Sequence, residues 1–486
     1  MSKKHVTYSE NESKENKMAY NYFKQQFKKE RQARREQTDD YFEEQTSADK
    51  IFEIEKLNDD FDGIAHKKGK MFVIKNALPG EKVEIKNVKK EEKVIKADIR
   101  RIIEPSEDRV SRKCKYADKC GACSLLHCSY SLQTSLKRKH LARKLTMLKG
   151  VTVGETVSVK QFGCRNKVHL VFGEENGAIT LGFFNETTHK VVDVKRCILH
   201  GDWYDETVQI IKDWATENKL SAYKPNVGKG VLRFVVLRKL KNNIMATVVA
   251  TSKPQGMQEL YFALKSLYDN VSLYLSVNTN KTNEVMSGKT EYVSGEKGLF
   301  CEMLGVKFIL GPQSFFQVNE LVAEKAYEKI RNIIKSQKAE CVIDAYSGIG
   351  ITSMLFAPCT KQVISIEINP EAVDNAKTLI SLNGIKNVKP LCGDFNKILP
   401  TLSVPDNTVF FVDPPRAGLG DSVVRRICAF APKTIIYMSC NPDTLKSDLF
   451  TFTANGYTIT EVTPFDMFPN TKHVETVVCL TRRLDN

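Results

Sequence analysis

The chain has 486 residues, too many for a single hydrophobic core, so two to four domains are expected. Basic residues exceed acidic ones by 15, and residues 1–310 carry the whole excess, with 55 basic against 40 acidic side chains. This division favours a polyanionic partner for the first part, with a basic surface kept for solubility as the alternative. No apolar run reaches 18 residues, and no apolar signal core is seen, which excludes a membrane-spanning or secreted chain from our expectations.

The thirteen cysteines are an odd number scattered along the chain, which indicates reduced thiols rather than a disulfide framework. We therefore expect a cytoplasmic protein, a monomer without membrane contact. Residues 1–49 are polar and rich in Lys, Glu and Gln, a composition that predicts a disordered extension. This extension could act as an RNA-binding arm or be a dispensable tail.

Residues 50–110 contain short segments of alternating polarity, such as Met71–Ile74 and Lys82–Ile85. Turn residues separate these segments, notably at Leu78–Glu81. Such spacing predicts a small closed β-barrel of the OB type. The stretch Gly63–Val83 resembles the TRAM domain, an RNA-binding barrel of several RNA-modifying enzymes, whereas the alternation alone would suit any small barrel.

A group of cysteines follows the barrel segment. Cys114, Cys120 and Cys123 form a C-x5-C-G-x-C pattern, and Cys197 is a further candidate. Four thiolates can hold zinc or an iron–sulfur cluster, and the ligand type alone does not decide between them. A redox couple is a third interpretation, but no thioredoxin-like βαβ pattern surrounds the cysteines.

Two further domains are predicted from the order of apolar segments. Residues 111–310 contain repeated strand-like runs, such as Val231–Leu237 and Ile244–Thr251, which predict an α+β domain with an antiparallel sheet. Residues 311–486 alternate apolar strands with helices, which predicts a doubly wound α/β domain.

A glycine turn near residue 348 indicates a nucleotide-type site. A buried strand leads through Asp344 to Gly348 and Gly350, where the missing side chains let the backbone approach a ligand. A second strand ends in Glu367, a carboxylate that can accept hydrogen bonds from both hydroxyls of a ribose. Ser353 replaces the third glycine of the dinucleotide fingerprint, so a dehydrogenase remains only as the alternative.

A cysteine at a strand-to-helix junction indicates covalent catalysis. Cys440 follows the apolar segment Thr434–Met438, and Asn441-Pro442 predicts the start of a helix. Because the N-terminus of a helix carries partial positive charge, we expect it to favour the thiolate, the form that attacks carbon.

Several ordered motifs in the second half resemble the RNA uracil-5 methyltransferase family, a class I S-adenosylmethionine-dependent group with a Rossmann-like catalytic domain. Asp344, Gly348 and Gly350 are similar to the cofactor loop of class I methyltransferases generally. The motifs that resemble the family itself are Gly311–Asn319, Asp413–Leu419, Ser439–Pro442 and Phe468–Glu475. With the TRAM-like segment and the cysteine pattern, the resemblance covers about residues 51–484.

The resemblance implies a mechanism and a set of site residues. Cys440 would add to carbon 6 of the uracil, and Glu475 would be the general base that removes the proton from carbon 5. Arg416 would either assist near the uracil or anchor its loop. By the same resemblance, S-adenosylmethionine would contact Gln317, Tyr346, Glu367, Asp394 and Asp413. A [4Fe–4S] cluster, with zinc as the alternative, would be held by Cys114, Cys120, Cys123 and Cys197, whereas Cys128 is expected to be a buried core residue.

The resemblance also implies an RNA substrate. Family members with both accessory features act mostly on large-subunit (23S) ribosomal RNA, so this partner is favoured over transfer RNA. A radical methylthiotransferase would need C-x3-C-x2-C spacing, which the chain lacks. A binding protein without activity is opposed by the presence of Cys440 and Glu475, and a cytosine-5 enzyme would place its nucleophile in a different motif.

Overall fold

The computed structural model describes residues 50–280 and 284–483, so the predicted extension 1–49 lies outside the described residues. The chain divides into two compact units, the first ending at Arg109 and the second beginning at Val110. Within the described ranges no helix is long and apolar enough to cross a membrane.

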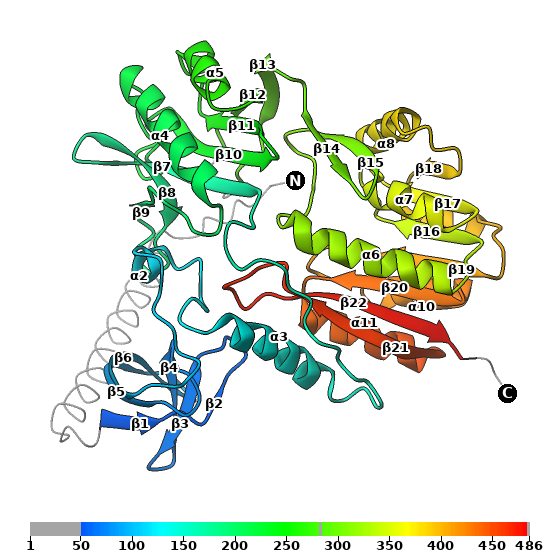
Figure 1. Cartoon of the computed structure of the whole chain (residues 1–486), viewed down its shortest axis with the longest axis horizontal. Helices are drawn as coiled ribbons and strands as arrows, with labels where there is room; N and C mark the ends of the chain where they lie inside the picture. The colour runs from blue at the N-terminus through cyan, green and yellow to red at the C-terminus, as the bar shows by residue number, and fades with distance from the viewer. Residues whose placement is uncertain (1–49, 281–283, 484–486) are drawn as a thin grey trace, which may run out of the picture. The chain divides into compact units, whose positions relative to one another are not determined.

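The first unit contains one sheet of short strands (Figure 1). In sheet order the strands are β1 (Ile51–Glu53), β5 (Lys82–Lys90), β6 (Ile95–Glu104), β4 (Lys70–Lys75), β3 (Gly63–Lys67) and β2 (Lys56–Leu57). The two edge strands are halves of one segment, and Glu55 between them donates its backbone N–H to the carbonyl of Ile64 at 2.9 Å. The sheet therefore closes on itself around a small apolar core. Its identity as a TRAM domain stays a prediction.

The second unit begins with a mixed sheet covered by helices on one face. In sheet order its strands are β13 (Lys289–Gly295), β12 (Asn270–Val277), β11 (Asn243–Ala250), β10 (Leu232–Leu240), β7 (Lys167–Glu175), β8 (Ala178–Phe184) and β9 (Val191–Asp193). The covering helices are α4 (Asp202–Glu217) and α5 (Met257–Lys265). All neighbours are antiparallel except β11 and β12, because the chain crosses over through α5 between them. The predicted antiparallel sheet is therefore wrong for this one pair.

The rest of the second unit is a three-layer α/β fold. In sheet order its strands are β18 (Val388–Cys392), β17 (Gln362–Glu367), β16 (Cys341–Ala345), β19 (Thr408–Val412), β20 (Thr434–Ser439), β22 (Glu475–Arg482) and β21 (Tyr457–Phe465). The first five are parallel, and β22 runs antiparallel to β20. The helices are α6 (Glu320–Ser336), α7 (Ile351–Phe356), η2 (Ala357–Cys359), α8 (Pro370–Leu382), α9 (Phe395–Ile398), η3 (Leu399–Thr401), α10 (Asp421–Phe430) and α11 (Pro442–Ala454). The predicted doubly wound domain is present.

The hydrophobic core of this α/β fold recruits residues from the predicted central domain. The hairpin of β14 (Leu299–Met303) and β15 (Val306–Leu310) alternates buried and exposed residues, and its buried side packs in the same core as α6. Helix α3 (Tyr130–Leu145) contacts α11 and β21 and contributes Leu141 and Leu145 to the second core cluster of this fold. The structure thus distributes residues 111–310 over both parts of the second unit, whereas strand and helix patterns predicted a boundary at residue 310.

Asparagine caps start three helices of the α/β fold. Asn319, Asn369 and Asn441 each accept a backbone N–H from the first turn of α6, α8 and α11, respectively. Pro370 and Pro442 occupy the first helical position, where the missing N–H costs nothing. The local sequence thereby places the starts of α8 and α11 beside the carboxyl ends of β17 and β20.

Candidate active site

The predicted site residues gather at the carboxyl edge of the parallel strands. Glu367 ends β17, Asp413 directly follows β19, and Cys440 directly follows β20. Since β22 runs in the opposite direction, its first residue, Glu475, lies at the same edge. Ligands of open α/β sheets bind at this edge, so the topology supports one site built from strands distant in sequence.

The glycine turn and Glu367 contact each other directly. The N–H of Gly348 donates to Oε2 of Glu367 at 3.0 Å, and the N–H of Asn369 donates to Oε1 at 2.8 Å. Gly348 and Gly350 have φ angles of 55° and 77°, a conformation that favours glycine. The carboxylate is therefore held rigidly beside the turn, with lone pairs left to accept hydroxyl groups.

Asp344, at the end of the strand before the turn, has an unsatisfied oxygen. Thr352 and Ser353 both donate to Oδ2, whereas buried Oδ1 has no partner within the described part of the chain. Burial raises the pKa of Asp344 to about 6, against the opposing effect of these hydroxyl groups. A buried carboxylate oxygen without a donor is costly, so a positively charged or hydrogen-bonding ligand fits here.

The other predicted cofactor residues lie around this point. Tyr346 follows β16, is 39% exposed, and places its ring centroid 5.8 Å from that of Phe395. Asp394 accepts the N–H of Asn396 at 2.9 Å and caps α9, so it also has a structural role. Gln317 is buried and hydrogen-bonds to Tyr327 of α6.

Tyr327 is a site residue that the sequence motifs did not reveal. Its hydroxyl is buried, and its pKa is raised by burial and then by the charge of Asp413, with Glu475 and Asp344 contributing. It therefore lies among the carboxyl groups of three different strands. The only sequence signal is the position of Tyr327 on the apolar side of an amphipathic helix. A tyrosine at such a position is ordinarily interpreted as a residue of the hydrophobic core.

Cys440 and Glu475 are brought together by strand register. Ser439 pairs with Thr476 across β20 and β22, so the next residue on each strand, Cys440 and Glu475, follows at the same end. The pKa of the Cys440 thiol is raised by burial and next by the charge of Glu475, in agreement with this register. A thiol and a buried carboxyl group therefore lie at the same edge of the sheet, on neighbouring strands.

The expected shift of the Cys440 thiol toward the thiolate is wrong. The pKa of the thiol is raised, first by burial and then by the charge of Glu475, while Arg416 acts in the opposite direction. Burial and neighbouring carboxylates thus outweigh the start of α11.

Arg416 opposes the accumulation of negative charge at this edge. Burial and then Asp413 raise the pKa of Glu475 well above its ordinary range, and Arg416 again lowers it. The pKa of Asp413 is raised to about 7 by burial and by Asp344. Asn441 Nδ2 and Thr444 Oγ1 both donate to the Arg416 carbonyl, so its backbone is anchored to α11 as well. The anchoring role of Arg416 is thus supported by its backbone contacts, and a role near the uracil stays a prediction.

The four predicted cluster cysteines lie on two segments of the chain, and their charges affect one another. Cys120 ends the short helix α2 (Ala117–Cys120), and Cys197 lies in the loop before α4. Burial raises the pKa of the Cys123 thiol to about 12. The charge of Cys197 is the next cause, and Cys120 and Cys114 also raise this pKa. Cys128, by contrast, is completely buried, as expected of a core residue.

The geometry of these thiols is not that of a compact metal site. Within residues 50–280 and 284–483, no three His, Cys, Asp or Glu side chains form a group that could hold a metal ion. The predicted ligands thus share one region, and neither zinc nor an iron–sulfur cluster is shown by the structure.

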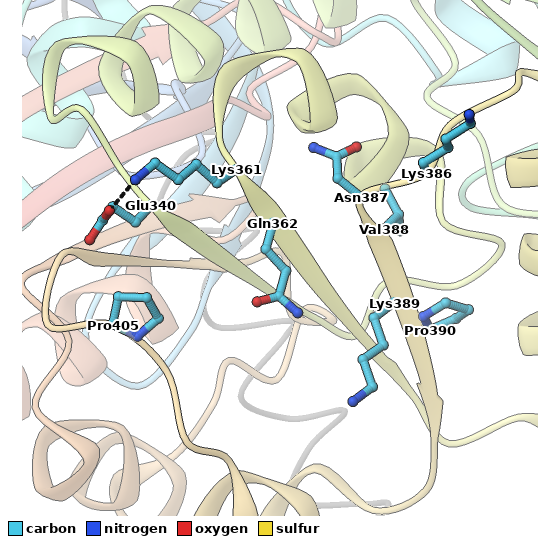
Figure 2. A pocket seen from close by; sticks show the side chains of 9 residues that line it. All are labelled: Glu340, Lys361, Gln362, Lys386, Asn387, Val388, Lys389, Pro390 and Pro405. Atoms are coloured by element: carbon cyan, nitrogen blue, oxygen red, sulfur yellow. Dashed lines mark hydrogen bonds and ion pairs between the residues drawn. The ribbon is translucent and has the colours of Figure 1, made fainter.

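A hollow of about 780 Å³ lies at the opposite, amino edge of the same parallel strands (Figure 2). Lys361 Nζ lies 2.5 Å from Oε1 of Glu340, and Figure 2 shows this ion pair among the residues that line the hollow. Its lining residues are Glu340, Lys361, Gln362, Lys386, Asn387, Val388, Lys389, Pro390 and Pro405. Because none of the predicted site residues lines this hollow, it is separate from the candidate active site.

The strand order, the glycine turn with its carboxylate, and the acidic groups at the carboxyl edge define an S-adenosylmethionine-dependent methyltransferase. The tRNA (uracil-5-)-methyltransferase family model matches residues 401–483, and the TRM5/TYW2 methyltransferase domain model matches residues 304–413. An uncharacterised RNA methyltransferase of Clostridium acetobutylicum is 32% identical over 89% of this chain and 99% of its own length. The chain belongs to the RNA uracil-5 methyltransferase family.

Two further similarities support this assignment. An uncharacterised RNA methyltransferase of Halalkalibacterium halodurans is 32% identical over 88% of this chain and 95% of its own length. A crystal structure of the Pyrococcus abyssi tRNA (uracil-54, C5)-methyltransferase with S-adenosyl-L-homocysteine has a TM-score of 0.73 and 28% identity, covering 89% of this chain and 99% of that chain. The predicted family is therefore confirmed, and the chain is an S-adenosylmethionine-dependent RNA methyltransferase.

Proposed function

We propose that this enzyme methylates carbon 5 of a uridine in RNA through a covalent adduct with Cys440. The observation that carries this proposal is the convergence of Cys440 and Glu475 at the carboxyl edge through the register of β20 and β22. Carbon 5 of uracil is a weak nucleophile, so a thiolate must first add to carbon 6. A buried carboxyl group beside that thiol can then serve as the base that the reaction needs.

The steps follow from these two side chains. Cys440 loses its proton to solvent, helped by the positive charge of Arg416, and its sulfur forms a bond to carbon 6 while the π bond between carbons 5 and 6 breaks. The resulting enolate carries the electron pair at carbon 5 that accepts the methyl group. The carboxylate of Glu475 then removes the proton from carbon 5. The electrons of that C–H bond form the double bond between carbons 5 and 6 and expel the Cys440 thiolate.

S-adenosylmethionine supplies the methyl group when it is bound. Glu367 would accept hydrogen bonds from the ribose hydroxyls, with Gly348 and Tyr346 near the nucleoside. Oδ1 of Asp344 has no hydrogen-bond partner among the described residues, and the raised pKa of Asp413 shows that its charged form is disfavoured there. A ligand that brings positive charge would stabilise the charged form of both carboxyl groups. We assign Gln317 and Asp394 to the same ligand on the family motif, and Asp394 also keeps its capping role.

We assign the four cysteines to a [4Fe–4S] cluster. Their electrostatic effects on one another support a shared site, and thiolates are the usual ligands of such clusters. Zinc stays the alternative, because thiolates hold both groups. Methyl transfer needs no electron transfer, so the cluster would serve the structure or the orientation of RNA.

Large-subunit ribosomal RNA is the substrate we favour, recognised by a cytoplasmic enzyme acting as a monomer. The basic excess of residues 1–310 would hold the RNA backbone, and the target base must leave its stack so that Cys440 can reach carbon 6. Transfer RNA is the second candidate, because the similar archaeal structure is named a tRNA (uracil-54, C5)-methyltransferase.

The test is to map 5-methyluridine in ribosomal and transfer RNA from cells with and without the gene. Loss of one or more ribosomal sites is the expected result, and loss of a transfer RNA site would select the second candidate. An unchanged 5-methyluridine map in both RNA classes would contradict the proposed function.

A further inference from the structure

We propose that Asn470 is a positioning residue for Glu475. It ties the loop before Glu475 to α3 and to residues 114–128, the cysteine-bearing segment, and so holds the Glu475 carboxylate at the carbon 5 proton. This inference rests on the proposed function, since it assigns Glu475 the role of general base. Asn470 lies five residues before Glu475, in the segment between β21 and β22.

Every polar atom of Asn470 is used by a residue that is distant in sequence. Its N–H donates to Oε1 of Gln133 at 2.9 Å, and its carbonyl accepts the N–H of Leu125 at 3.0 Å. Its Nδ2 donates to the carbonyl of Gln161 at 3.1 Å, and its Oδ1 accepts Nε2 of Gln161 at 2.9 Å. The residue is completely buried, so each lost bond would leave a buried polar group unsatisfied.

Gln133 extends this network to the cysteines. Its Nε2 donates to the carbonyls of Leu125 and Cys128, at 3.0 and 3.1 Å, and lies 3.3 Å from Oδ1 of Asn470. Leu125 lies two residues after Cys123. One buried amide of α3 therefore joins the end of the cysteine-bearing segment to the loop that precedes the general base.

The loop that carries Asn470 is also fixed at its other end. Phe465 pairs with Glu475 across β21 and β22, so residues 466–474 form a loop closed at its base. Lys137 of α3 donates to the carbonyl of Phe468 at 2.9 Å and forms a buried ion pair with Asp466. Asn470 is the second attachment of this loop. A displacement of the loop backbone should therefore displace Glu475, the first residue of β22.

Asn470 also has the backbone conformation that this attachment needs. Its φ angle is 63°, in the left-handed region that asparagine tolerates better than most residues. Cys440 lies outside this loop, between β20 and the capped start of α11. Loss of the Asn470 side chain should therefore displace the base without displacing the nucleophile.

The test separates the two halves of the reaction with substrate RNA that carries tritium at carbon 5. Proton transfer needs Glu475 within hydrogen-bond reach of carbon 5, so Asn470→Gly should slow tritium release by about tenfold or more. Adduct formation and methyl transfer in a single turnover should stay near the wild-type rate, and a methylated covalent adduct should accumulate. Glycine keeps the left-handed backbone and removes only the side chain.

Two further variants keep the test decisive. Asn176→Gly is the matched control, because Asn176 has a φ of 51° in an exposed hairpin turn away from the network. It should behave as the wild type. Asn470→Asp keeps an acceptor for Gln161 Nε2 and replaces the donor to the Gln161 carbonyl by a second carboxyl oxygen, so it should show the same selective slowing of tritium release if Asn470→Gly does not fold.

The outcomes distinguish the inference from the function on which it rests. Equal slowing of methyl transfer and tritium release in both Asn470 variants would show a merely structural role and overturn the inference. Wild-type rates for both steps would overturn it as well. A wild-type enzyme that neither methylates uridine nor releases tritium would instead contradict the proposed function.

Discussion

The buried ion pair between Lys137 and Asp466 predicts that helix α3 is an integral part of the methyltransferase core. Neither side chain is exposed to solvent, and Lys137 also donates to the Phe468 carbonyl. Asp466 receives a second bond from the Tyr130 hydroxyl, at 2.8 Å. Replacing Lys137 by methionine would leave Asp466 as a buried charge with one neutral donor.

The magnitude follows from that loss. Removing one partner of a buried ion pair destabilises a protein by about 3–5 kcal/mol, because the remaining charge stays desolvated. Lys137→Met should therefore lower the free energy of unfolding of the second unit by about that amount. Replacing both partners, as Lys137→Met with Asp466→Leu, should recover much of the loss, since apolar replacements of buried pairs are often nearly neutral.

Urea denaturation of the full chain, followed by tryptophan fluorescence and circular dichroism, would measure these values. Lys144→Met is the matched control on the same helix, because Lys144 pairs with Asp443, whose side chain is 68% exposed. That pair should contribute less than about 1 kcal/mol. If Lys137→Met costs no more than this control, the assignment of α3 to the core is refuted.

Three more predictions concern the cluster, the carboxyl groups and RNA. Anaerobically purified protein should contain iron and sulfide. Cys120→Ser should lose both, whereas Cys128→Ser should keep them. Stoichiometric zinc without iron would contradict the assignment of an iron–sulfur cluster. Because the pKa of Asp413 is raised to about 7, the folded state binds that proton more tightly, so stability should fall as pH rises from about 4 to 7. Asp413→Asn should reduce this fall, and denaturation at pH 5 and pH 8 would check it; an equal fall in the variant argues against the assignment. RNA affinity should decrease linearly on a log–log plot against salt, and a flat plot would exclude binding through the basic residues.

Local signals in the sequence were sufficient for the strands and helices that carry the chemistry. Asn441-Pro442 predicted the start of α11, and the structure places Cys440 between β20 and that helix. Glu367 was predicted at the end of a strand, and it contacts the glycine turn directly. These features depend on capping and on short apolar runs, which are written in a few neighbouring residues.

Features that depend on distant partners were missed. Lys137 and Asp466 are separated by 329 residues, and no local pattern indicates that they pair. Tyr327 was not singled out from the sequence, because its carboxyl neighbours come from other strands. The pKa of Cys440 was predicted in the wrong direction, because the burial and the neighbouring charges that raise it arise only when the strands assemble. The same holds for the shared core that crosses residue 310.

The covalent mechanism is tested most directly by comparing Cys440→Ala and Glu475→Gln after incubation with S-adenosylmethionine and labelled substrate RNA. Cys440→Ala removes the nucleophile, so neither 5-methyluridine nor a protein–RNA adduct should form. Glu475→Gln leaves addition and methyl transfer intact but removes the base, so a methylated adduct should accumulate and survive denaturing electrophoresis. Normal turnover by Cys440→Ala, or an equal loss of every step in Glu475→Gln without a trapped adduct, would contradict the mechanism.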